Sequence, residues 1–212
     1  MRALPDLSLY LVTDSRLIGQ KNLLSVVEPA LKGGVKVVQF REKSMEAKEI
    51  FDVAMELRAL TSKYNVPLII NDRLDIAQAV DADGVHLGQL DLPVEKVRQI
   101  LGANKLIGFT VHNEAQAKAA NQMDVDYVVA APVFRTNTKL DTRGLLGFEG
   151  LRSILKVSKK PVIAAGGISL KNIAEVVDMD VDGVVVVNPI MTSDDPQLSA
   201  EKFVNMLTPM KI

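Results

Sequence analysis

The chain has 212 residues, a formal net charge of −1 and no cysteine. This balance offers no global attraction for nucleic acid or an anionic membrane, and the lack of cysteine excludes disulfides, thiolate metal sites and cysteine nucleophiles. No stretch approaches about 18 apolar residues and the N-terminus lacks an apolar signal core, so we expect one cytoplasmic domain spanning residues 1–212.

Eight short apolar runs alternate with segments of helical spacing. Continuous aliphatic runs are typical of parallel strands buried on both faces. The runs cover residues 9–12, 35–40, 68–70, 85–87, 106–109, 127–131, 161–165 and 183–187. The helical segments cover residues 23–31, 44–64, 76–80, 93–101, 114–122, 149–159 and 199–207, with a further helix after residue 169. The alternation predicts a single-domain (β/α)8 TIM barrel. An open doubly wound sheet is disfavoured, because no G-x-G-x-x-G motif follows the first strand.

Several helix ends carry residues that favour capping. Ser44 is expected to begin the second long helix without a capping box, with Glu46 supporting that end. Pro93 suits the first turn of its helix, whereas Asn113 and Ser169 are predicted as N-caps. A weak repeat, Asp-x-Asp followed by Gly or Tyr and then Val, marks three helix-to-strand turns at 81–85, 124–128 and 180–184.

Polar side chains gather after the strands, at the ends that form the active face of such a barrel. After the second strand, Gln39, Arg41 and Lys43 alternate with Phe40 and Glu42. Because successive side chains of a strand point to opposite faces, the first three are expected to point into the barrel mouth and the other two away from it.

The same rim receives carboxylates from the next two strands. Asp72 follows the third strand beside Asn71, Asp91 follows the fourth, and Lys139 follows the sixth. Carboxylates with an amide favour a hard cation, and the cations would neutralise a diphosphate, so the set predicts a Mg²⁺–diphosphate site. For any one of these residues a solvated surface charge is at least as good an explanation, but less so for the set.

A second anion site is predicted after the seventh and eighth strands. Gly166 and Gly167 follow the seventh strand, and Val187 and Asn188 end the eighth. Backbone N–H groups at this place in a barrel, near a helix N-terminus, can hold a phosphate monoester. Hydroxyl donors would come from Thr136 and Thr138. A pair of glycines alone is more often a simple turn.

The two histidines do not predict a zinc site, because a third ligand is lacking. His86 lies within the fourth predicted strand, where a structural imidazole is the better interpretation. His112 follows the fifth strand, where a general base and a structural role are equally good interpretations.

Seven segments, in order along nearly the whole chain, resemble the thiamine-phosphate synthase family. They are 10–14 (YLVTD), 39–43 (QFREK), 70–72 (IND), 84–91 (GVHLGQLD), 132–139 (PVFRTNTK), 147–150 (GFEG) and 166–168 (GGI). The resemblance implies the coupling of hydroxymethylpyrimidine diphosphate with thiazole phosphate. Diphosphate would leave first, and the thiazole nitrogen would attack the resulting pyrimidine-stabilised cation.

The resemblance also implies roles for individual residues. The residues expected to bind pyrimidine diphosphate are Gln39, Phe40, Arg41, Glu42, Lys43, Asn71, Thr110 and Lys139, of which Arg41, Lys43 and Lys139 would be catalytic. The residues expected to bind thiazole phosphate are Thr136, Asn137, Thr138, Gly166, Gly167, Val187 and Asn188. Asp72 and Asp91 would bind Mg²⁺ as cofactor.

The chain departs from the usual family residues at four places: Ala131, Arg135, Thr110 and Asn188. Asn188 stands where serine is usual in the phosphate loop, and Thr110 keeps the hydroxyl of the usual serine. The departures therefore concern the thiazole-phosphate half more than the diphosphate half. The expected partners are small-molecule substrates, without nucleic acid or membrane, and a homo-oligomer is compatible with the sequence.

Two other functions compete with this one. A thiazole tautomerase of the same fold would use His112 as its base and would not need the diphosphate cluster. A non-catalytic barrel that binds a phosphate ligand would need neither metal carboxylate.

Overall fold

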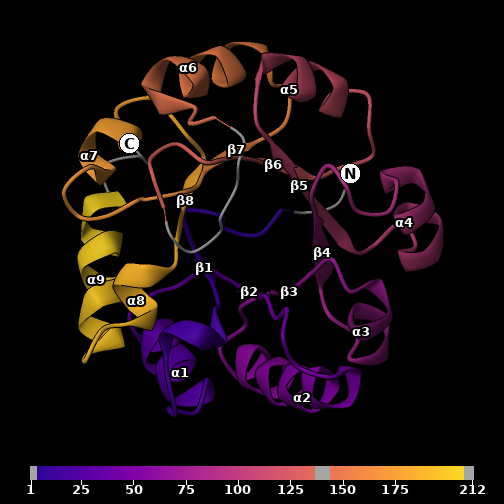
Figure 1. Ribbon diagram of the computed structural model, residues 1–212, viewed down its shortest axis with the longest axis vertical. Coiled ribbons are helices and arrows are strands. Elements are labelled where there is room, and N and C mark those ends of the chain that lie inside the picture. Colours follow the sequence, from indigo (N-terminus) through magenta and orange to yellow (C-terminus); the bar gives the residue numbers. More distant parts are fainter. Residues whose placement is uncertain (1–3, 137–143, 208–212) are drawn as a thin grey trace.

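The computed structural model describes residues 4–136 and 144–207. Within them, parallel strands close into a barrel in the order β1 to β8, each paired with its sequence neighbours and β8 paired with β1 (Figure 1). The strands are β1 Leu9–Val12, β2 Val37–Phe40, β3 Leu68–Asn71, β4 Gly84–Leu87, β5 Leu106–Val111, β6 Tyr127–Ala130, β7 Val162–Ala164 and β8 Gly183–Val186. The predicted (β/α)8 barrel is confirmed.

Helices surround the barrel (Figure 1). They are α1 Leu24–Lys32, α2 Ala47–Lys63, α3 Leu74–Ala79, α4 Val94–Leu101, α5 Glu114–Ala120, α6 Gly147–Val157, α7 Ile173–Val177, α8 Asn188–Met191 and α9 Pro196–Leu207. The short 3-10 helix η1, Ser15–Leu17, and α8 were not predicted from the sequence. None of the helices in the described ranges is long and apolar enough to cross a membrane.

Three predicted helix ends are corrected by the structure. The second long helix begins at Ala47 instead of Ser44, because Glu46 and Glu49 form a reciprocal capping box there. Pro93 is the N-cap of α4 and not its first helical residue. The residue before α7 is Asn172, which lies three residues beyond the predicted cap, Ser169. Asn113 does cap α5, since its side chain accepts from the Gln116 N–H at 2.9 Å.

Alternation along the strands separates two apolar regions. Outward-facing side chains such as Phe40 pack with the surrounding helices in the main core. Inward-facing side chains, including Tyr10, Ile69 and Tyr127, fill the barrel interior below its carboxyl rim. The filled interior leaves the rim as the place where the barrel can receive a ligand.

The Asp-x-Asp repeat has a physical explanation in the barrel. In all three copies the second aspartate accepts a hydrogen bond from the N–H of the first or second residue of the preceding strand: Leu68 to Asp83 at 2.8 Å, Ile107 to Asp126 at 2.8 Å and Val162 to Asp182 at 2.7 Å. The backbone N–H of this second aspartate donates in turn to the carbonyl of the same strand residue. Each copy thus ties the start of one strand to the start of the next.

We predict that Asp182→Ala lowers the free energy of unfolding by about 1–2 kcal/mol, because the Val162 N–H loses its charged acceptor. Urea denaturation at pH 7 measures the change. Asp178→Ala, at the exposed end of α7, is the matched control and should change stability by less than about 0.5 kcal/mol. Equal effects of the two substitutions would contradict this role of the repeat.

Candidate active site

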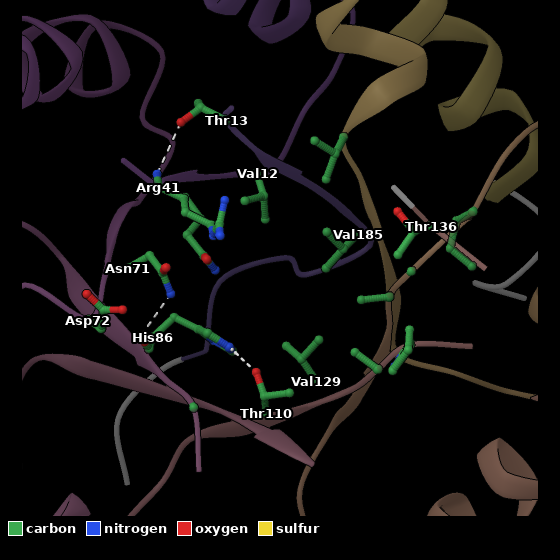
Figure 2. A pocket seen from close by; sticks show the side chains of 18 of the residues that line it. Val12, Thr13, Arg41, Asn71, Asp72, His86, Thr110, Val129, Thr136 and Val185 are labelled. Carbon is green, nitrogen blue, oxygen red and sulfur yellow. Dashed lines mark hydrogen bonds between the residues drawn. The ribbon is translucent and has the colours of Figure 1, made fainter. Parts of the chain in front are cut away.

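A cavity of about 370 Å³ opens at the carboxyl ends of the strands. Its lining comes from the ends of all eight strands and the loops after them. Figure 2 shows Arg41, Asn71 and Asp72 on one side of the pocket, with Val185 and Thr136 on the other. The cavity therefore has a charged side and a less polar side.

The loop after β2 supplies the cations of the charged side. Gln39, Arg41 and Lys43 line the cavity, as strand alternation predicts. Phe40 packs in the outer core and Glu42 is buried elsewhere, so neither belongs to the cavity lining. Alternation along the backbone thus separates Phe40 and Glu42 from the other three residues of the 39–43 motif. The resemblance implied that Phe40 and Glu42 also bind pyrimidine diphosphate, but these two residues are not in the lining of this cavity.

Arg41 is positioned from the end of β1. Its backbone N–H donates to the Thr13 hydroxyl at 3.1 Å, and its guanidinium lies 3.9 Å from the Asp14 carboxylate (Figure 2 shows the Thr13 contact). Hydrogen bonds from Arg16 lower the pKa of Asp14, against the effect of its burial. Asp14 therefore stays ionised and faces Arg41 with negative charge.

Glu42 organises the loop after β2. It accepts hydrogen bonds from the hydroxyls of Ser15 and Ser44 and from the backbone N–H groups of Lys43 and Ser44, the last three at 2.7 Å. Burial alone would raise the pKa of Glu42, but these donors outweigh it and lower the pKa to about 2. The buried carboxylate thereby fixes the backbone from which Lys43 projects.

Both predicted metal carboxylates line the cavity. Asp72 has a left-handed backbone (φ 57°), which aspartate tolerates better than most residues, and its carboxylate pairs with the Lys43 ammonium. The Asp91 carboxylate accepts the Gly88 N–H at 2.6 Å. The amide of Asn71 donates to the His86 carbonyl at 3.3 Å (Figure 2).

The donor set at this rim suits a cation that shares its coordination with substrate. Among the residues that the structure describes, no three His, Asp or Glu side chains form a group that could hold a metal ion. Asp72, directly after β3, and Asp91, in the loop after β4, both bring carboxylates to the lining of the one cavity. Mg²⁺ is commonly bound through one or two carboxylates together with phosphate oxygens and water, so this pair fits Mg²⁺.

Polar side chains continue into the floor of the cavity. The His86 ring and the Thr110 hydroxyl are hydrogen-bonded at 2.7 Å, and Gln89 donates to the Thr110 carbonyl at 2.6 Å. The Gln39 amide donates to the Tyr10 hydroxyl at 2.9 Å, and Tyr10 is hydrogen-bonded to Tyr127. Burial raises the pKa of Tyr10, so its phenol stays neutral and available to the amide.

The glycine loop after β7 forms the opposite side. Gly166 and Gly167 have positive φ (96° and 65°), and a Cβ atom on Gly167 would lie 2.6 Å from the Arg135 carbonyl oxygen. The helix that was expected soon after these glycines is α7, and it begins only at Ile173. The short helix α8 instead begins at the cavity, with Asn188. A short extra helix after the eighth strand often completes a phosphate site in this fold.

Asn188 lines the cavity, as expected of a residue of the phosphate loop. Its side chain accepts a hydrogen bond from the Thr192 hydroxyl at 2.9 Å. Thr136, Val187 and both glycines also line the cavity, whereas Asn137, Thr138 and Lys139 lie outside the described residues.

Comparison with known proteins adds an independent observation. The family model described as thiamine monophosphate synthase matches residues 9–190. A thiamine-phosphate synthase of Desulfitobacterium hafniense is 42% identical over 95% of this chain and 97% of its own, and one of Methanobrevibacter smithii is 44% identical over 92% and 93%. A solved structure of thiamine phosphate pyrophosphorylase from Pyrococcus furiosus is 36% identical, covers 98% of both chains and has a TM-score of 0.89.

The chain belongs to the thiamine monophosphate synthase family. The resemblance drawn from the seven sequence segments is therefore confirmed, and with it the assignment to a family of transferases. His112, whose role the sequence left open, lines the cavity of this family member and its ring is hydrogen-bonded to the Ala131 carbonyl at 2.6 Å.

Sequence reasoning missed several residues of the site. Thr13, Asp14 and Gln89 were not proposed, although the first two stand at a strand end and within a segment shared with the family. Leu90, which is highly exposed and lines the cavity beside Asp91, gave no signal because an isolated leucine in a loop is common on surfaces.

We predict that Glu42→Gln destabilises this family member by about 2 kcal/mol at pH 7. The folded pKa of Glu42 lies below its ordinary value of 4.5, so its contribution is complete above about pH 4.5 and is lost as the pH falls towards 2. The difference between the two proteins in urea denaturation should therefore shrink between pH 5 and about pH 3.

The matched control is Glu56→Gln, on the exposed face of α2, which should alter the free energy of unfolding little at either pH. A constant gap between wild type and Glu42→Gln across this range would show that the carboxylate charge is not what stabilises the loop.

Proposed function

We propose that this chain couples hydroxymethylpyrimidine diphosphate with thiazole phosphate, giving thiamine phosphate and diphosphate, with Mg²⁺ as cofactor. The observation that carries the proposal is one cavity with Arg41, Lys43, Asp72 and Asp91 on its rim, in a chain whose relatives are named thiamine-phosphate synthases. Neither a phosphate-binding barrel without activity nor a tautomerase requires that combination of charges.

The charged side suits the pyrimidine diphosphate. Arg41 and Lys43 present cations to the leaving diphosphate, and in a preorganised cavity they stabilise negative charge as it develops there. The amides of Gln39 and Asn71 lie deeper and can hydrogen-bond the polar edge of the pyrimidine ring. Lys139 would add a third cation, although its position falls outside the described residues.

Asp72 and Asp91 would hold the Mg²⁺. Bound there, Mg²⁺ supplies electrostatic neutralisation of the diphosphate leaving group. The Gly88 N–H donates to one Asp91 oxygen at 2.6 Å, which restrains the orientation of this carboxylate.

The less polar side suits the thiazole phosphate. Backbone N–H groups around Gly167 and Asn188 would bind the phosphate, with the Thr136 hydroxyl close to them in the lining. The aliphatic side chains of Val129 and Val185 offer an apolar surface between the two anion sites, where two flat rings could meet (Figure 2). The roles of Asn137 and Thr138 in binding this phosphate remain predictions.

The reaction needs no enzymatic nucleophile under this proposal. The Thr110 hydroxyl is hydrogen-bonded to His86 and is not presented as a free nucleophile. The protein's own contribution is to bring the two substrates together, to stabilise the departing diphosphate with Arg41 and Lys43, and to limit the access of water to the cation formed from the pyrimidine.

The direct test is incubation of the purified protein with both substrates, with and without Mg²⁺, and chromatographic detection of thiamine phosphate. Product that requires both substrates and Mg²⁺ supports the proposal. Isomerisation of a thiazole carboxylate without pyrimidine diphosphate would favour the tautomerase, and binding without product would favour the non-catalytic barrel.

We predict that Asp91→Asn lowers the Mg²⁺-dependent coupling rate by about 100-fold, since a neutral amide is a much weaker ligand for a hard cation. Steady-state kinetics over a range of Mg²⁺ concentrations measures the loss. Asp52→Asn, on the exposed surface of α2, controls for the change of one charge and should keep full activity. An Asp91→Asn variant as active as wild type would remove Asp91 from the metal site.

We also predict that Gly167→Ala raises the KM for thiazole phosphate about tenfold or more, because the left-handed backbone and the nearby Arg135 carbonyl leave no room for Cβ. Asn188→Ala, whose side chain bonds Thr192, should change that KM by less than about threefold. The KM for pyrimidine diphosphate should remain unchanged in both variants; a large change there would contradict the division into two anion sites.

A further inference from the structure

We propose that Lys43 is an internal counter-ion that occupies the place of the metal beside Asp72 until diphosphate arrives, so that metal and diphosphate bind as a pair. The proposal rests on the proposed function, because it takes Asp72 and Asp91 as the metal ligands. It adds an order of events and a thermodynamic coupling that the proposed function alone does not require.

The contact that carries the proposal crosses the mouth of the cavity. The Lys43 ammonium, from the loop after β2, pairs with the Asp72 Oδ2 atom at the end of β3. The Lys43 side chain is 49% exposed and that of Asp72 is 20% exposed, so the pair lies at the boundary between cavity and solvent. An ion pair in this position is weak enough to be exchanged.

Among the described residues, Lys43 is the cation in direct contact with Asp72, because the neighbouring arginines contact other carboxylates. The Arg73 guanidinium is bonded to Asp75 at 2.9 and 2.5 Å. The Arg41 guanidinium faces Asp14, at 3.9 Å. Lys43 itself combines a backbone held by Glu42 with a flexible four-carbon side chain, which allows its ammonium to move while its Cα atom stays in place.

Charge balance then favours metal binding only when diphosphate binds as well. An ammonium and a divalent ion cannot both occupy the face of the same carboxylate oxygen. Metal alone would neutralise Asp72 and Asp91 but would displace Lys43 into a rim that also holds Arg41, leaving an excess of positive charge. Diphosphate removes this excess because its oxygens accept both the metal and the displaced ammonium.

The proposal predicts opposite effects of one substitution on two binding reactions. Lys43→Gln removes the competing cation, so it should tighten the binding of a divalent metal alone by about three- to fivefold. The same substitution removes a donor to diphosphate, so it should weaken the binding of a metal–diphosphate complex by about tenfold or more. A merely structural role for Lys43 would not produce this reversal.

The experiment is isothermal titration of the full chain with Mn²⁺ alone and with a preformed one-to-one Mn²⁺–pyrophosphate complex. Lys48→Gln is the matched control, because it makes the same change of charge at a side chain of α2 that is 87% exposed. Circular dichroism checks that the variants are folded. Lys48→Gln should bind each ligand as tightly as wild type does. Lys43→Gln should bind Mn²⁺ alone more tightly than wild type and the Mn²⁺–pyrophosphate complex more weakly.

Two outcomes overturn the proposal. One is unchanged or weaker binding of Mn²⁺ alone by folded Lys43→Gln. The other is a double variant, Lys43→Gln with Asp72→Asn, that binds Mn²⁺ alone as tightly as Lys43→Gln does, since the gain would then not arise at Asp72. The titration measures binding and not turnover. A protein that shows the opposite effects on binding but makes no thiamine phosphate therefore contradicts only the proposed function.

Discussion

Closure of eight parallel strands is the constraint on which the rest of this molecule depends. It brings every strand's carboxyl end to one rim, so that residues far apart in the chain, such as Arg41, Asp91 and Gly167, line a single cavity. The Asp-x-Asp turns tie together strand starts at the opposite end. Stability and chemistry are thereby assigned to opposite ends of the same barrel.

Carboxylates position or neutralise the two cations of the rim, Arg41 and Lys43. Buried Glu42 and Asp14 are kept ionised by the groups that bond to them, and each faces or supports a cation of the cavity. Lys43 and Asp72 neutralise one another directly. A small anionic ligand that arrives with a divalent cation can exchange with the Lys43–Asp72 pair without leaving a net charge uncompensated, as a metal–diphosphate site requires.

Local sequence patterns were sufficient to predict the barrel and much of the cavity lining. The apolar runs identified every strand found in residues 4–136 and 144–207, and alternation correctly placed Arg41 inside and Glu42 outside the barrel mouth. What could not be predicted depends on contacts distant in sequence: the bond of Ser15 to Glu42 spans 27 residues, and the pair of Lys43 with Asp72 spans 29. The helix α8 was missed because four residues are too few to establish a helical period.

A crystal structure of the protein with Mg²⁺ and inorganic pyrophosphate tests this charge exchange at the rim most directly. We predict the metal on Asp72 and Asp91, pyrophosphate bonded to Arg41, and the Lys43 ammonium on pyrophosphate instead of Asp72. Pyrophosphate bound only at the glycine loop around Gly167, with the pair of Lys43 and Asp72 intact, would contradict it.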